Sequence, residues 1–435
     1  MEAGVRLLSA PAPVPANAGP SEAPLPGTPL DSTRGEIRAL TGLRLVAALW
    51  VLVFHYHYTP GEVYSQTWEA IRPLVLMGPM GVDLFFVLSG VVIAHTYAAR
   101  LGASLRLHAA GSFLWARISR IWPAYAFVTI GFGIWLVVRA HIGIDPMISY
   151  QPIQPDLGWQ SWVSQLLMVQ FVTNWPTFNG SSFVAPGWSI SAEWMAYLAF
   201  PLLVLLTWRL RRLPVTVLGA LALVPLLPQA WVALGQSEPS AFWMVRIAGG
   251  FTSGVLVWLA VRKVPRTTRV SRIAAWVAVG ALAEIVIIAW WADAMGAEIG
   301  TAQARALASL AFPVLIGALA LSDHGPAALL GRSWAVHGGR ISYSLYLIHY
   351  PIFEVYWTAT AHLPALAPGS PLQSLVTPHV LLLSLLAAHL LWCWVEEPAR
   401  LWLRARDPFR RVAAAAESES ESVPRVAAAR GLQEV

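Results

Sequence analysis

One apolar stretch, residues 40–58 with the sequence LTGLRLVAALWVLVFHYHY, carries arginine and histidine at a spacing that could support chemistry. Arg44 and His55 are eleven residues apart, so on an α-helix both lie on one face, about 16 Å apart along the axis. His57 points about 200° away from His55. Because an ionisable group at membrane depth is energetically costly, the pattern indicates function. A cation near one membrane surface and an imidazole deeper in the membrane could hold the two ends of one elongated substrate.

Two further polar groups lie inside apolar sequence. Asp83, in GVDLFFVLSG, either orients His55 or anchors two helices, because a carboxylate within a membrane needs a cation, a proton or a neighbouring histidine. Ser189 and Glu193, in GWSISAEW, are four residues apart and share a helix face. The start of a helix explains an acidic residue there equally well, so both interpretations stay open.

A polar stripe and a basic pair complete the candidate residues. Ser342, Tyr346 and His349, in RISYSLYLIHYP, lie on one face of an apolar helix, where hydrogen bonds between helices explain them as well as chemistry does. Arg117 and Arg120, in FLWARISRIWP, are one helical turn apart at the expected cytoplasmic surface. They form a clamp for phosphate groups or serve only to set the topology.

Smaller features concern packing and helix ends. The last apolar stretch ends in VEEPAR, where Glu396 or Glu397 could pair with arginines of the inner surface. Pro398 is expected to stop this helix, because proline has no N–H group. Gly250 and Gly254 have the small-residue spacing that lets two membrane helices approach closely.

The composition indicates whether the chain lies in water or in a membrane. With 57% hydrophobic and only 12% charged residues, the chain is typical of a helical membrane protein. The single cysteine, Cys393, excludes an intramolecular disulfide and a cysteine-based metal site. The side chains of His55 and His57 point in different directions and give no pair of metal ligands, so we expect no metal. Basic residues are dispersed between apolar stretches rather than gathered on one face, so we expect no nucleic-acid partner.

The elements that position these residues are apolar helices. We predict an all-α bundle of about ten transmembrane helices, at residues 38–58, 74–97, 121–140, 186–208, 215–234, 242–261, 273–293, 303–321, 341–360 and 377–397. With the N-terminus inside, the 29 basic residues fall on the inner side except Arg72, Arg139, Arg246 and Arg305. The positive-inside rule therefore predicts that both termini are cytoplasmic.

The predicted domain organisation is simple. Residues 1–36 form a disordered cytoplasmic lead, residues 37–405 the membrane domain, and residues 406–435 a disordered cytoplasmic tail. In the outer segment, the semi-apolar piece at residues 161–175 lies in the interface, re-enters the membrane or crosses it. We expect a multi-pass protein of the inner (plasma) membrane, in contact with membrane lipid.

The motifs, taken in chain order, resemble the integral-membrane acyltransferase 3 family. The Arg44 to His55 pattern is followed by GVDLFFVLSG, FLWARISRIWP, GWSISAEW, ISYSLYLIHYP and a closing EEP, over about residues 36–405. The resemblance implies transfer of an acyl group, commonly acetyl, from cytoplasmic acyl-CoA to a hydroxyl of an envelope polysaccharide, peptidoglycan, lipid or macrolide. It also implies His55 as the catalytic histidine, Arg44 as its partner, and Arg117 and Arg120 in handling the donor.

Some positions match this family and others depart from it. Ser189 and Glu193 correspond to the WS-S-E segment of the family. Thr41 stands where an acidic residue is usual, which makes Asp83 the nearest acidic candidate in sequence. Either Asp83 or Glu193 is therefore expected to fix the tautomer of His55. Many polysaccharide-modifying relatives carry a fused extracytoplasmic domain, which we do not expect here.

The residues and the resemblance lead to one mechanistic hypothesis. Arg44, Arg117 and Arg120 bind the phosphates of acyl-CoA, with acetyl-CoA as the expected donor. His55 then acts as general base or as acyl relay toward a sugar-containing or polyketide hydroxyl. The alternative is a proton-coupled transporter or flippase, which also has many spans and intramembrane charge. Against this alternative, the two halves of the sequence show no obvious internal repeat.

Overall fold

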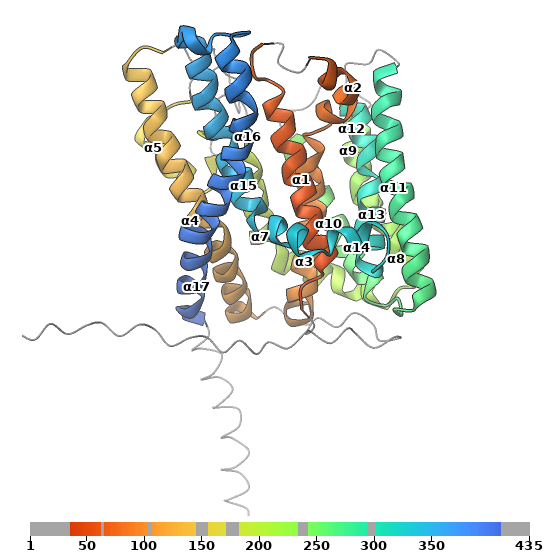
Figure 1. Cartoon of the computed structure of the whole chain (residues 1–435). Helices are drawn as coiled ribbons and strands as arrows, with labels where there is room; N and C mark the ends of the chain where they lie inside the picture. Colours follow the sequence, from red (N-terminus) through yellow and green to blue (C-terminus); the bar gives the residue numbers. More distant parts are fainter. Residues whose placement is uncertain are drawn as a thin grey trace, which may run out of the picture.

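The computed structural model describes residues 35–61, 65–102, 104, 106–144, 155–170, 182–233, 242–294 and 302–409. Within these ranges the chain forms helices and turns and no strand, which confirms the prediction of an all-α protein. Figure 1 shows the long helices side by side with roughly parallel axes, as in a membrane bundle. The expectations for residues 1–34, 171–181 and 410–435 lie outside the described residues.

The helices follow one another with short connections. The first half comprises α1 (Arg38–Tyr56), α2 (Ser65–Leu76), α3 (Met80–Leu101), α4 (Leu107–His141), α5 (Trp159–Leu166), η2 (Ala185–Gly187), α7 (Trp188–Thr207), η3 (Trp208–Arg212), α8 (Val215–Leu221), η4 (Val224–Leu226) and α9 (Leu227–Ala233). The second half comprises α10 (Phe242–Val261), α11 (Thr268–Ala294), α12 (Ala302–Ser309), α13 (Ala311–Leu321), α14 (Pro326–Leu330), α15 (Ser333–His362), η5 (Pro364–Leu366), α16 (Pro371–Leu391), η6 (Trp392–Glu396) and α17 (Glu397–Ala405).

Eight helical segments of the described chain are long and apolar enough to cross a membrane. They correspond to eight of the ten predicted spans. The predicted span 215–234 is instead a series of short pieces, α8, η4 and α9, because Pro225 and Pro228 interrupt the helical hydrogen bonds. The predicted span 341–360 lies in α15, which is 30 residues long and carries the polar stripe.

Five predicted starts differ from the structure by more than the expected four residues: 74, 121, 273, 341 and 377 correspond to Met80, Leu107, Thr268, Ser333 and Pro371. The helix expected at 121–140 begins at Leu107, so Arg117 and Arg120 lie inside α4 rather than at its edge. The helix can continue through both arginines because Arg117 donates a hydrogen bond to Tyr97 and Arg120 pairs with a carboxylate of the bundle. The helix expected at 74–97 begins at Met80, since the turn before it separates it from α2.

The predicted stop at Pro398 is also wrong. α16 passes through the π-helical turn η6 into α17, and the helix continues to Ala405. Pro398 directly follows the π-helical turn, in which the N–H of Glu397 donates to the carbonyl oxygen of Trp392, and the helix continues past this proline although it has no N–H to donate. π turns occur frequently at functional sites, and this one places the side chain of Glu396 in the protein interior.

The start of α1 and the end of α17 lie at the same end of the bundle (Figure 1). At this end Arg340 forms an ion pair with Glu36 at 2.7 Å, and Arg38 donates a hydrogen bond to the carbonyl oxygen of Gly331 at 3.0 Å. Both described chain ends thus leave from one side, as an even number of crossings requires.

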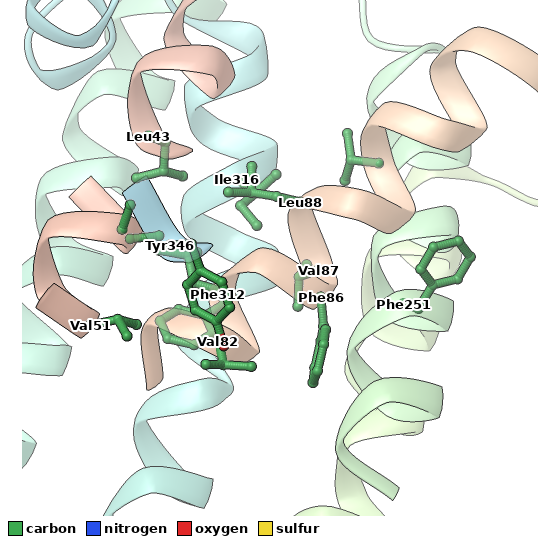
Figure 2. Close-up of a cluster of buried hydrophobic side chains, with 14 of the residues drawn as sticks. Leu43, Val51, Val82, Phe86, Val87, Leu88, Phe251, Phe312, Ile316 and Tyr346 are labelled. Carbon is green, nitrogen blue, oxygen red and sulfur yellow. The ribbon is translucent and has the colours of Figure 1, made fainter. Parts of the chain in front are cut away.

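The core forms where α1, α3, α10, α13 and α15 meet. Figure 2 shows the buried side chains of this cluster, among them Phe86 and Leu88 of α3 and Phe312 of α13. α3 and α10 cross at glycines: a Cβ atom on Gly254 would lie 2.9 Å from the Cα of Gly90 and would overlap the carbonyl oxygen of Val87. The spacing of Gly250 and Gly254 therefore serves close helix packing, as the sequence predicts.

A second glycine contact joins α1 to α15. A Cβ atom on Gly339 would overlap the carbonyl oxygen of Thr41, and one on Gly338 would lie 2.5 Å from the side chain of Leu45. Because neither glycine has a side chain, the backbone of α15 approaches α1 closely here. This contact sets the relative position of the two helices that carry His55 and His349.

Candidate active site

Two histidines from distant parts of the chain meet inside the bundle. The Nε2 atom of His349 lies 3.2 Å from the Nδ1 atom of His55. Both side chains are buried, with exposed fractions of 7% for His55 and 0% for His349. Each Nδ1 atom also lies against a carbonyl oxygen one turn earlier in its own helix, Val51 at 3.0 Å and Leu345 at 2.9 Å.

These contacts define the tautomers of the imidazole pair. The Nδ1–H of His349 donates to Leu345, which leaves its Nε2 as an acceptor. The Nδ1–H of His55 donates toward Val51 and His349, so neutral His55 has its basic lone pair on Nε2. If Nε2 of His55 takes up a proton, the hydrogen bond to His349 becomes charge-assisted and stronger.

Tyr346 connects the imidazole pair to the start of α7. Its ring lies 6.0 Å from the ring of His349, and its hydroxyl lies 2.7 Å from the hydroxyl of Ser189. Both hydroxyls also lie 3.0 Å from the carbonyl oxygen of Pro186. The structure therefore brings Ser189, Tyr346 and His349 together, and it holds the polar face of α15 against α7.

The three predicted donor-binding arginines form a second cluster. The guanidinium of Arg44 lies over the ring of Phe85 at 5.7 Å, and that of Arg117 lies over the ring of Tyr97 at 5.3 Å. Arg120 pairs with Glu396, and it is close enough to Arg44 and Arg117 for mutual repulsion.

Two of these guanidinium groups have no counter-ion in the part of the chain that the structure describes. Among the described residues, no salt bridge joins Arg44 or Arg117 to a carboxylate. The cluster therefore holds more guanidinium groups than directly paired carboxylates, which leaves an excess of positive charge.

Aromatic side chains link the arginine cluster to the imidazole pair. The ring of Phe85, which lies under Arg44, contacts the ring of Tyr346 at a centroid distance of 6.1 Å. Tyr346 in turn contacts His349. On α1, Arg44 contacts Phe85 of α3 and His55 contacts His349 of α15, so both side chains point toward neighbouring helices of the bundle.

Comparison with known proteins identifies the family. The family described as an acyltransferase domain matches residues 37–395. This chain belongs to that acyltransferase family. The acyltransferase is 26% identical to Acyltransferase MdmB of Streptomyces mycarofaciens over 343 residues, which cover 73% of this chain and 79% of the relative. It is 30% identical to Protein 2 in picA locus of Rhizobium radiobacter over 157 residues, 35% of this chain and 75% of the relative. No solved structure matches the chain.

The family match supports one of the two predicted functions. An acyltransferase domain spanning most of the chain, together with the apolar helices, identifies a membrane acyltransferase. The alternative of a transporter or flippase receives no support from these relatives.

Neither predicted carboxylate orients His55 in the acyltransferase. Both oxygens of Asp83 accept hydrogen bonds from Arg246 of α10, at 2.8 and 2.9 Å, so Asp83 is the counter-ion of that arginine. Glu193 accepts hydrogen bonds from the hydroxyls of Ser89 and Tyr197. Tyr197 also interacts with Arg117, so Glu193 belongs with the arginine cluster. The imidazole of His349 occupies the position on Nδ1 of His55 that a carboxylate was expected to take.

Sequence reasoning missed the residues that neutralise the buried charges. Arg139 of α4 pairs with Glu354 of α15, and both are buried. Three of the four arginines outside the inner set each pair with a carboxylate; these pairs are Arg72–Asp293, Arg139–Glu354 and Arg246–Asp83. One signal could have found them: a cation and an acid at similar depth in two membrane helices tend to pair.

The closing EEP motif joins the arginine cluster. Glu396 pairs with Arg120 and accepts a hydrogen bond from the hydroxyl of Ser344 at 2.5 Å. Glu397 pairs with Arg400 in the next turn. The prediction that one of these glutamates binds an arginine is confirmed for both.

His57, the C-terminal cap of α1, has different surroundings from His55. His57 follows α1 directly, and its ring lies 5.1 Å from the ring of Tyr58 rather than against His349. Within the described ranges, no group of three histidine, cysteine or acidic side chains is arranged to hold a metal ion. His57 is therefore a suitable control for substitutions of His55.

Proposed function

We propose that this membrane acyltransferase moves an acyl group, with acetyl expected, from acyl-CoA at the inner (plasma) membrane to a hydroxyl of a sugar-containing or polyketide acceptor. The observation that carries the proposal is the buried pair of His55 and His349, which lies next to an arginine cluster and is connected to it by aromatic side chains. A base and an anion-binding region are the two components that transfer from CoA requires.

The acceptor hydroxyl is activated by His55. The oxygen of the acceptor hydroxyl attacks the carbonyl carbon of the thioester and forms a C–O bond. At the same time, Nε2 of His55 takes the proton of this hydroxyl. The C–S bond then breaks, and the CoA thiolate leaves with the proton of the imidazolium. General-base catalysis of this kind is typically worth about 10²–10⁴-fold. His349 stabilises the imidazolium, because its Nε2 accepts the Nδ1–H of His55 at 3.2 Å.

An acyl-histidine relay is the second version of this mechanism. In it, Nε2 of His55 attacks the thioester itself, the CoA thiolate leaves, and the acceptor hydroxyl then attacks the acyl-imidazole. The same tautomer of His55 serves both versions, since each needs the lone pair on Nε2. Quenching the reaction with labelled acetyl-CoA in the absence of acceptor separates them, because only the relay leaves label on the protein.

The donor phosphates are bound by Arg44 and Arg117, with Arg120 beside them. Because Glu396 compensates the charge of Arg120, the first two arginines supply most of the net positive charge. A guanidinium presents paired N–H donors that fit phosphate oxygens. Since Arg44 and His55 are on one helix, a donor bound by its phosphates at Arg44 would extend toward His55.

The first test measures label transfer from radiolabelled acetyl-CoA by the full-length protein in nanodiscs, with a crude cell-lipid and glycan extract as acceptor. We expect His55→Ala to abolish transfer and His57→Ala to leave it nearly intact. If the wild-type protein neither binds nor consumes acyl-CoA of any chain length, the donor assignment fails. If His57→Ala is as inactive as His55→Ala, the assignment of the base fails.

A further inference from the structure

An apolar groove of about 320 Å³ lies between α8, α10, α11 and α13, apart from the imidazole pair and the arginine cluster. Its lining is entirely apolar and includes Gly219, Val257, Ile273 and Val314. The groove opens on the surface of the bundle, since 54% of Ile273 and 42% of Val314 is exposed. In a membrane, such an opening faces lipid.

The mouth of the groove is strongly basic. The segments next to it, WRLRR at 208–212 and RKVPRTTRVSR at 262–272, contain eight basic residues and no acidic one. The Nζ atom of Lys263 donates to the carbonyl oxygens of Arg211 and Leu213, at 3.2 and 2.6 Å, so its charge lacks a carboxylate there. Arg269 and Arg272, at the start of α11, are exposed.

Arg266 at this mouth has a hydrogen-bond donor that nothing satisfies. One of its terminal nitrogens donates to the carbonyl oxygen of Ala320 at 2.7 Å, which holds the side chain beside α13. Its Nε atom is buried and has no hydrogen-bond partner among the described residues. Asp323 is the nearby carboxylate, and it is already bound by Ser271 and His324. The same segment, residues 262–272, holds four further cations and no acidic residue, so the mouth favours an anionic ligand.

We propose that the groove binds one anionic phospholipid of the surrounding leaflet. Its acyl chain fills the apolar groove, and its phosphate accepts hydrogen bonds from Arg266 with Arg269 and Arg272 beside it. The basic mouth excludes a second copy of this chain, because a symmetric contact would place two identical basic segments together. The lipid ties α11 to the bundle, since only 28% of the apolar window of α11 is buried by protein.

Matched variants separate the groove from the mouth. Gly219→Phe places a ring at the groove, at a position where an added Cβ atom meets no atom within 4 Å. Gly280→Phe is its control: Gly280 is equally open but does not line the groove. Arg266→Gln removes the phosphate ligand, and Arg106→Gln is its control, an exposed arginine at the start of α4.

The experiment counts lipids retained by the detergent-purified protein in native mass spectrometry, after incubation with equal amounts of phosphatidylglycerol and phosphatidylcholine. We expect one retained phosphatidylglycerol, with a preference of about fivefold for each cation that contacts it. Gly219→Phe and Arg266→Gln lose this lipid, and both controls keep it. Equal retention of the two lipids, or unchanged retention in Gly219→Phe, overturns the proposal. Displacement of the lipid by acetyl-CoA also overturns it, because the groove would then belong to the donor.

Discussion

Replacing His349 by leucine should slow the chemical step without affecting donor binding. In the proposed transition state His55 becomes an imidazolium whose Nδ1–H points at Nε2 of His349, 3.2 Å away. A hydrogen bond to a charged group contributes about 1.5–3 kcal/mol, which corresponds to roughly a tenfold to 150-fold effect on kcat. Because the carbonyl oxygen of Val51 remains 3.0 Å from the same nitrogen, we expect the lower end, about tenfold to thirtyfold.

The assay compares initial rates of label transfer from acetyl-CoA for wild type, His349→Leu, His349→Gln and His55→Ala in nanodiscs. The amide oxygen of glutamine can accept the same hydrogen bond, so His349→Gln should recover part of the rate. The KM for acetyl-CoA should stay within about twofold in both His349 variants, because this residue is remote from the phosphates. Thermal unfolding of each variant checks that the bundle is intact.

Two results would refute this role for His349. A kcat for His349→Leu within about twofold of wild type would show that the imidazolium needs no acceptor at this position. A loss as large as that of His55→Ala, together with no rescue by glutamine, would make His349 a direct participant in proton transfer instead of a positioning residue.

Three other predictions concern charge. Arg44→Gln and Arg117→Gln should each raise the KM for acetyl-CoA by about tenfold or more with a smaller change in kcat, measured against Arg106→Gln as control. Asp83→Leu should reduce the free energy of unfolding by about 3–5 kcal/mol, because Arg246 loses its buried carboxylate. The double variant Asp83→Leu/Arg246→Met should recover part of this loss. Equal stabilities of the single and the double variant would contradict the pairing. The hydrogen bond from Ser271 holds the pKa of Asp323 below its usual range, so the stabilisation by this carboxylate is present above about pH 4 and is lost as the pH falls through the lowered pKa. The difference in Tm between wild type and Asp323→Asn should therefore be present at about pH 5 and vanish at lower pH.

The local pattern of the sequence predicts which face of a helix points inward. The period of the α-helix places Arg44 and His55 on one face of α1, and Ser342, Tyr346 and His349 on one face of α15. In the structure His55 meets His349 and Tyr346 lies beside His349, whereas Arg44 lies over Phe85 and Ser342 bonds to its own helix. Family membership likewise follows from six short motifs in order. Both results depend on residues near one another in the chain.

Contacts between distant helices could not be predicted in this way. His55 and His349 are 294 residues apart, and nothing in the period of either helix specifies the other as its partner. The sequence left two interpretations open for Asp83, and its ion pair with Arg246 of α10 corresponds to the anchor between two helices, a partner that proximity in sequence could not identify. The π-helical turn that contains Glu396, the partner of Arg120, has no sequence signal that we could use.

The close contact of α1 with α15 makes the spacing of the two imidazoles adjustable from a distance. Each imidazole is held by a carbonyl oxygen of its own helix, so the gap between them depends on how far apart the two helix axes lie. Gly339 sets that separation about 15 Å along α15 from His349. An alanine there would act as a spacer, widening the gap between base and acceptor while leaving every side chain of the active site unchanged. Natural sequence variation at this glycine would thus tune the reaction rate without altering the chemistry of the site.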